Sequence, residues 1–165
     1  MKIGIISDTH DNLVNIRKAI EEFKKEGIDL LIHCGDFVSL FVIKEFYNIN
    51  CDIIAVYGNN DGEREKLKEM LKNINKNNTI ADFQSVEIDG LKFFITHGHY
   101  QEILDLAIAS KLYDVIIYGH THERVFENID NTLIINPGEC CGYLTGEATI
   151  GILDTEKREY KEIFL

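Results

Sequence analysis

The sequence predicts a layered α/β fold with mixed β-sheets. In the first half of the chain, short apolar runs alternate with segments in which apolar residues recur at helical spacing. In the second half, strand-like runs occur in pairs joined by short turns. Alternating strands and helices predict parallel strands with right-handed crossovers, whereas hairpins predict antiparallel strands. With 165 residues, 45% of them hydrophobic, the chain is expected to form one domain over residues 1–165.

The first half is expected to contain two consecutive βαβ units. An apolar run ends at Ser7, and a segment of helical periodicity then continues to Gly27, a residue type that commonly ends helices. The next two strands are each closed by polar residues beside a glycine. The expected strands span 3–7, 29–33 and 53–57, and the expected helices span 13–26, 39–47 and 63–71. The polar stretch 73–78 is expected to be a surface loop.

The second half is expected to be built mainly from hairpins. Asp89-Gly90 is a strong two-residue turn signal between runs 83–88 and 91–96. A helix over about 102–111 and a strand over 114–118 are expected next. The remaining hairpins pair residues 124–128 with 132–135 and residues 148–153 with 159–164.

Composition narrows the class of protein. Seventeen basic and 28 acidic residues give a net charge of −11, which argues against binding in a duplex nucleic-acid groove. No apolar stretch is long enough to span a bilayer and the start of the chain does not resemble a secretory signal, so a cytoplasmic location without a membrane partner is expected. Cys34, Cys51, Cys140 and Cys141 are expected to be buried free thiols, with a surface thiol at Cys140-Cys141 as the alternative.

Five short polar clusters follow predicted strands, and they contain five of the six histidines. Strand ends in one sheet can bring residues that are distant in sequence to one edge. Imidazole nitrogen and carboxylate oxygen are ligands that divalent metals prefer, so the clusters together predict a metal site. His33 is left out of this site as a structural histidine. The expected ligands are Asp8, His10, Asp36, Asn59, His97, His120 and His122.

The ordered set of these clusters resembles a known family. Asp-x-His at 8–10, Gly-Asp at 35–36, Gly-Asn-x-Asp at 58–61, His-Gly-His at 97–99 and Gly-His-Thr-His at 119–122 look like the motifs of the calcineurin-like metallophosphoesterases. The resemblance covers residues 3 to about 138 and is nearest to the small single-domain phosphodiesterase (YfcE-like) branch. It implies two packed mixed β-sheets flanked by helices, an α-β-β-α sandwich.

The resemblance also implies a binuclear metal centre. One metal would be held by Asp8, His10, Asp36 and His122. The second would be held by Asp36, Asn59, His97 and His120, so that Asp36 bridges both. A hydroxide shared by the two metals would attack phosphorus in a phosphodiester substrate. Mixed oxygen and nitrogen ligation is compatible with Mn²⁺, which we prefer, and with Ni²⁺, Co²⁺, Fe²⁺ or Zn²⁺.

Several positions near the ligands carry further expectations. Asn60 stands where many members have histidine, and because an amide is not a general acid we expect diesters to be favoured over monoesters. Asp61 either orients the site or caps the following helix. His99 either contacts substrate or forms a hydrogen bond within its own loop. Glu139 stands where the family often has serine, and a carboxylate at the rim of the site would disfavour extra negative charge on the substrate.

Other functions stay open at this point. The chain could be a catalytically weak scaffold like the retromer subunit that shares this fold, although none of the seven expected ligands is missing. It could be a phosphomonoesterase, or a metal-dependent hydrolase of non-phosphate bonds. An exposed edge of the C-terminal antiparallel strands could also support a homodimer.

Overall fold

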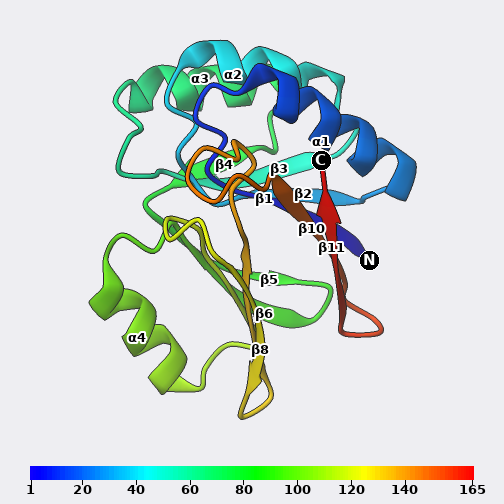
Figure 1. The fold of residues 1–165 in the computed structure, drawn as a ribbon. Helices are drawn as coiled ribbons and strands as arrows, with labels where there is room; N and C mark the ends of the chain where they lie inside the picture. The colour runs from blue at the N-terminus through cyan, green and yellow to red at the C-terminus, as the bar shows by residue number, and fades with distance from the viewer.

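The computed structural model describes all residues 1–165 and contains two β-sheets packed face to face, with helices on both outer sides (Figure 1). This confirms the expected α-β-β-α arrangement. The first sheet has the strand order β11-β10-β1-β2-β3-β4 and the second has the order β5-β6-β7-β9-β8. The strands of the first sheet are β1 (Lys2–Ile6), β2 (Leu30–His33), β3 (Asp52–Val56), β4 (Thr79–Ala81), β10 (Thr149–Asp154) and β11 (Glu159–Phe164).

The second sheet and the helices complete the layers. The strands of the second sheet are β5 (Phe83–Ile88), β6 (Leu91–Thr96), β7 (Val115–Ile117), β8 (Arg124–Ile129) and β9 (Thr132–Pro137). The helices are α1 (Leu13–Glu26), α2 (Leu40–Glu45), the 3-10 helix η1 (Phe46–Asn48), α3 (Arg64–Ile74) and α4 (Gln101–Ser110). In Figure 1, α1, α2 and α3 lie over the first sheet and α4 lies beside the second. None of these helices is both long enough and apolar enough to cross a bilayer.

Alternation along the strands divides the core into layers. In β1, Ile3 and Ile5 pack into the core between the sheets, whereas Ile6 packs into the core under α1, α2 and α3. A third, smaller core contains Phe94 of β6 and Leu104 of α4. Successive side chains of a strand point to opposite faces, so both faces of the first sheet are covered.

Parallel pairing places the strand ends that carry the polar clusters at one edge. β1, β2, β3 and β4 are parallel, and β6, β7 and β9 are parallel in the second sheet. Antiparallel strands flank both groups, as the hairpin signals predicted. The mostly exposed β8 and β11 form sheet edges, and the homodimer stays a prediction.

One expectation about the fold needs correction, and one strand was missed. Residues 73–78 are not simply a surface loop, because α3 continues to Ile74 and Asn78 is fully buried. Asn78 accepts a hydrogen bond from the Ile53 N–H at 2.8 Å and donates one to the Leu71 carbonyl at 3.0 Å. The short strand β4 after it was not predicted, since three residues are too few to show a pattern.

The cysteines follow the first of their two interpretations. Cys34, Cys140 and Cys141 are buried, Cys51 is partly buried, and all four are free. The alternative of a surface thiol at Cys140-Cys141 is wrong, because both residues are buried and their backbone N–H groups bond to the segment that follows β1. Cys140 N donates to Ser7 O and Cys141 N donates to Asp8 O.

Candidate metal centre

The loops after β1, β2, β3, β6 and β7 meet at one edge of the sandwich and bring the expected ligands together. Backbone hydrogen bonds hold these loops against one another. Asp8 N donates to Gly35 O, His10 N donates to Asp36 O, and Gly119 N donates to His97 O. The loops that carry the expected ligands are therefore held in place by their neighbours.

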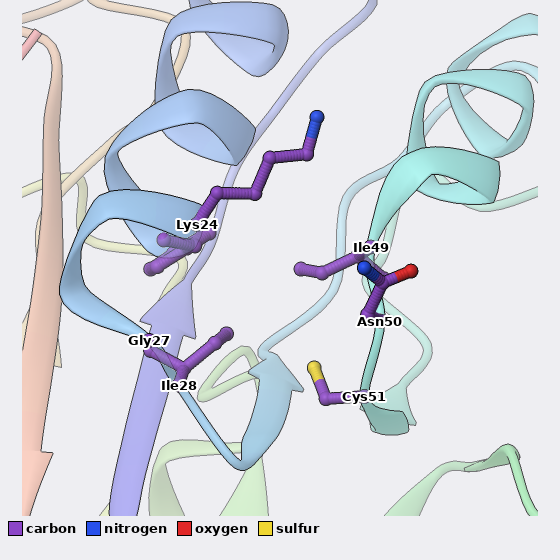
Figure 2. Close-up of a pocket in the computed structure, with 7 residues that line it drawn as sticks. Lys24, Gly27, Ile28, Ile49, Asn50 and Cys51 are labelled. Atoms are coloured by element: carbon purple, nitrogen blue, oxygen red, sulfur yellow. The ribbon is translucent and has the colours of Figure 1, made fainter.

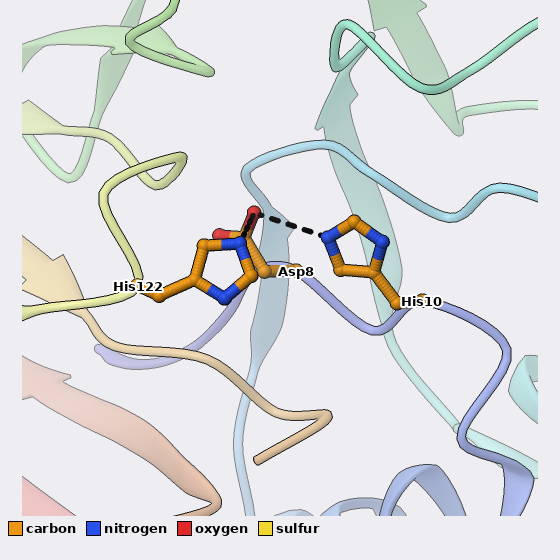
Figure 3. A group of neighbouring side chains, drawn as sticks. All are labelled: Asp8, His10 and His122. Atoms are coloured by element: carbon orange, nitrogen blue, oxygen red, sulfur yellow. Dashed lines mark ion pairs between the residues drawn. The ribbon is translucent and has the colours of Figure 1, made fainter. Parts of the chain in front are cut away.

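Asp8, His10 and His122 form the first group, in which both histidine rings face the Asp8 carboxylate (Figure 3). Asp8 Oδ1 lies 3.4 Å from His122 Nε2 and 3.7 Å from His10 Nε2. The other carboxylate oxygen, Oδ2, accepts hydrogen bonds from Ser7 Oγ at 2.6 Å and from His120 N at 3.0 Å. Oδ1 is buried and has no hydrogen-bond partner. A buried carboxylate oxygen is costly to leave unpaired, and a cation beside it would satisfy it.

Asp36 lies between this group and a second one. Its Oδ2 atom is 3.2 Å from His10 Nε2 and 3.5 Å from His97 Nε2. The contact with His10 does not have the geometry of a hydrogen bond. His97 Nε2 is in turn 3.0 Å from Asn59 Oδ1, and the His97 and His120 ring centroids are 5.1 Å apart. The seven expected ligands thus fall into two groups that meet at one carboxylate.

The charges of these groups are strongly coupled. Asp36 and Asp8 raise the pKa of His10 to about 10. Burial favours the neutral acid of Asp36, yet contacts with His10 and His97 hold the pKa of that carboxyl well below its usual range. Burial works against a charged His97, but the Asp36 and Asp8 carboxylates raise its pKa overall. Metal binding would compete with protons for these imidazoles, because an imidazole that binds a metal must lose its proton from the ligating nitrogen.

The backbone at this edge adopts conformations that L-residues rarely use. Twelve non-glycine residues have positive φ, and five of them are expected ligands. Two glycines permit the close approach of the loops. A Cβ on Gly58 would collide with the Asp36 side chain, and a Cβ on Gly119 would collide with Ser7 Oγ. The five expected ligands with positive φ are Asp8, His10, Asp36, His120 and His122.

Asn60 and Asp61 both contact the Asp36 segment. The Asn60 N–H donates to Asp36 Oδ1 at 2.9 Å, and its side-chain amide donates to Oδ2 at 2.8 Å. Asp61 is buried and accepts hydrogen bonds from the N–H groups of Asp36, Val38 and Gly58 at 3.0, 2.8 and 2.7 Å. The N-cap residue of α3 is Glu63, so Asp61 does not cap that helix. Its contacts tie the loop after β2 to the loop after β3.

The two remaining histidines differ in their surroundings. Nδ1 of His99 is buried without a hydrogen-bond partner, so the expected alternative of a hydrogen bond from this atom within its own loop is absent. Its ring centroid lies 5.4 Å from that of His97. His33 is fully buried, stacks on Phe37 with centroids 3.5 Å apart, and accepts a hydrogen bond from Gly35 N at 3.1 Å. His33 thus stands apart from the expected ligands.

The expectation that Glu139 lies at the rim is wrong. Glu139 has no exposed surface and its Oε2 atom is 2.6 Å from His122 Nδ1. Burial alone would raise the pKa of its carboxyl, but hydrogen bonds from Cys141, His122 and Thr145 lower the pKa to about 2. The sequence signal that could have revealed this role is the pair of nearby glycines, Gly142 and Gly146, which let the loop fold back on the carboxylate.

Two supporting residues were not predicted. Ser7 bonds to Asp8 Oδ2, as described above, and Asn136 donates hydrogen bonds to Gly119 O and Thr121 Oγ1, both at 3.0 Å. Both residues are fully buried. They fix the loops that carry Asp8 and His120.

Comparison with known proteins decides the family. The calcineurin-like phosphoesterase superfamily domain matches residues 1–158. The chain belongs to this superfamily. It is 74% identical to phosphodiesterase MJ0936 of Methanocaldococcus jannaschii, over 100% of this chain and 99% of the relative. Phosphodiesterase YfcE of Escherichia coli K12 is 28% identical, over 94% of this chain and 89% of the relative.

Solved structures agree on the fold. A structure of an archaeal phosphodiesterase superposes with a TM-score of 0.98 at 74% identity, with each chain covered completely. Vps29 of Chaetomium thermophilum superposes with a TM-score of 0.71 at 16% identity, over 100% of this chain and 96% of the other. At that identity the likeness concerns the fold alone.

Proposed function

We propose that the chain is a phosphodiesterase that depends on two divalent metal ions. One observation carries the proposal: the buried, unpartnered Asp8 Oδ1 faces the Nε2 atoms of His10 and His122. An arrangement of this kind fits a cation, since a carboxylate oxygen and two imidazole nitrogens converge on one point. The relative at 74% identity is a phosphodiesterase, which supports the reaction type.

The metal-binding residues are proposed as two sets that share one carboxylate. Asp8, His10, Asp36 and His122 would hold one ion, and Asp36, Asn59, His97 and His120 would hold the other. The position of Asp36 Oδ2, between His10 Nε2 and His97 Nε2, supports the shared role. When bound, the ions would supply positive charge to the phosphoryl oxygens and activate water for attack on phosphorus. Mn²⁺ is the preferred metal, with Ni²⁺, Co²⁺, Fe²⁺ and Zn²⁺ as alternatives.

Three neighbouring residues are proposed to serve the reaction. Asn60 is exposed beside Asp36, so its amide can donate a hydrogen bond to a bound phosphoryl group. The His99 ring lies beside those of His97 and His120, and burial together with these two histidines lowers its pKa, which favours a neutral ring at the substrate. Asp61 acts indirectly, because its contacts are with backbone N–H groups of the loops that hold Asp36 and Val38.

Diesters are the proposed substrate class, and Asn60 is the reason. An amide cannot protonate a leaving oxygen near neutral pH, so esters with good leaving groups should react best. Asn60→His should shift the ratio of monoester to diester turnover toward monoesters. An unchanged ratio would show that Asn60 does not govern substrate choice.

The decisive test uses bis(p-nitrophenyl) phosphate as a generic aromatic diester. Protein stripped of metal should be inactive, and Mn²⁺ or Ni²⁺ should restore hydrolysis. Equal rates with and without metal would remove the metal dependence, and no turnover with any metal would remove the enzyme proposal and leave a scaffold role. The proposed substrate is a small phosphodiester. The proposed compartment is the cytoplasm, which the four free cysteines support.

A further inference from the structure

We propose that Glu139 is a positioning residue that holds His122 in the orientation the metal centre needs, and that it ties this histidine to the loop at residues 143–145. The inference rests on the proposed function, in which His122 is a metal ligand. It concerns a residue that lies behind the ligand, on the far side of the imidazole ring from Asp8.

The two nitrogens of His122 face two different carboxylates. Nδ1 is 2.6 Å from Glu139 Oε2, while Nε2 is 3.4 Å from Asp8 Oδ1. Glu139 and Asp8 have no exposed surface, and His122 is buried. A carboxylate accepts hydrogen bonds only, so the short contact requires the proton of the neutral ring to sit on Nδ1. The lone pair of Nε2 is then directed toward Asp8, where the metal is proposed.

Glu139 is itself held by the loop that follows it. The backbone N–H groups of Tyr143, Leu144 and Thr145 all donate to its carboxylate, as does the Thr145 hydroxyl. The Cys141 thiol adds a hydrogen bond to Oε2 at 3.0 Å. Three successive amides that converge on one carboxylate fix its place in the loop. A change in the position of this loop would therefore be transmitted to the ring of His122.

These contacts also exclude a metal ion of its own at Glu139. His122, Glu139 and Cys141 are close enough together to suggest a third cation site. The carboxylate, however, already accepts bonds from three backbone N–H groups, a thiol, a hydroxyl and an imidazole. That number uses up the lone pairs of a carboxylate. Hydrogen-bond donors surround the Glu139 carboxylate on all sides. It therefore acts as a hydrogen-bond acceptor for His122 rather than as a metal ligand.

The first measurement needs no variant. Long-range ¹H–¹⁵N spectra of Zn²⁺-loaded protein report which nitrogen of His122 carries the proton. We expect a protonated Nδ1 and a metal-shifted Nε2. If no metal binds, the same spectra of metal-free protein report the tautomer of the neutral ring. A neutral ring protonated on Nε2 would overturn the role of Glu139, whereas failure of the wild type to bind any metal would overturn the proposed function instead.

The second measurement compares Glu139→Gln with Cys141→Ala by calorimetric titration of Mn²⁺. Loss of a carboxylate behind a ligating histidine typically weakens metal binding about 10–100-fold. In Glu139→Gln we expect the Mn²⁺ affinity of one site to fall by this amount. The affinity of the other site should change by less than about threefold. Cys141→Ala removes a donor to the same oxygen but leaves His122 in place, so both sites should keep their affinity within about twofold.

Two results would overturn the inference. One is unchanged affinity at both sites in a folded Glu139→Gln protein. The other is an equal loss in Cys141→Ala, which would show that any disturbance of this loop has the same effect. If Glu139→Gln does not fold, Glu139→Asp keeps the charge but shortens the reach to Nδ1, and the same weakening at one site is expected. The tautomer of His122 in the wild type tests the role of Glu139 without either variant.

Discussion

The two ends of the parallel strands show how differently one sheet can be used. Where β1, β2 and β3 end, buried carboxylates and imidazoles converge, and Asp8 Oδ1 has no hydrogen-bond partner. Where β2 and β3 begin, a cavity of about 390 Å³ separates the end of α1 from the segment before β3 (Figure 2). Phe23, Ile28 and Ile49 line it. This cavity thus lies at the end that lacks the expected ligands, and the site is identified by its donor groups rather than by cavity volume.

Backbone geometry separates the two ends in the same way. Five expected ligands have positive φ, and such conformations each cost about 1–3 kcal/mol in non-glycine residues. At the cavity end, the residue with positive φ is Gly27, which ends α1 without that cost. The metal end therefore combines rarely used backbone conformations with a buried carboxylate oxygen that lacks a hydrogen bond, whereas no non-glycine residue that lines the cavity has either feature. Each prediction below tests this contrast.

The largest effect is expected from removing the shared carboxylate. Asp36→Ala should lower kcat/KM for an aromatic diester by about 10³-fold, because the charge that joins the two groups is lost. The matched change at the other end is Asp52→Ala, which removes the acceptor for Asn75 and Asn77. Its cost should be about 1 kcal/mol of stability with activity within about twofold of wild type. Comparable activity loss in both variants would refute the contrast.

The next effect is at the cavity end and concerns stability alone. Phe23 is a fully buried residue of α1, so Phe23→Ala should lower the free energy of unfolding by about 3–4 kcal/mol. Urea unfolding measures that loss. The Mn²⁺ affinity of the folded variant should match the wild type, and a tenfold weaker affinity would mean that the helix layer sets the geometry of the metal end.

Added metal should stabilise the protein through the metal end only. At a free Mn²⁺ concentration of 100 times Kd, the expected gain in the free energy of unfolding is about 2.7 kcal/mol for each independent site. Thermal unfolding with and without Mn²⁺ tests this. The gain should persist in Phe23→Ala and shrink in Asp36→Ala. Equal gains in both variants would place the binding site elsewhere.

The sequence predicted residues in local motifs better than residues whose partners are distant in the chain. Motifs at strand ends are local in sequence, so the expected ligands could be named, and the structure brings them together. Glu139 was placed wrongly, because its partners come from a loop that folds back around it and only the nearby glycines hint at that loop. Asn78 was misjudged for a related reason: a buried amide is recognisable only once its partners in β3 and α3 are known. Polar residues satisfied by distant backbone look like surface residues in a sequence.

The smallest effect of metal binding is expected at Cys51, which lines the cavity. Burial, assisted by Asp52 and Asp29, raises the pKa of this thiol to about 12. At pH 8 the thiolate is then scarce, and iodoacetamide should modify Cys51 about 10³-fold more slowly than a free cysteine. Peptide mapping by mass spectrometry measures the rate, and denatured protein with four reactive thiols is the control.

Because the two ends are separate, Mn²⁺ should change this rate by less than about twofold in the absence of unfolding. Protection by tenfold or more would show that binding at the metal end tightens the packing between α1 and β3, and the two ends would then have to be treated as one coupled unit.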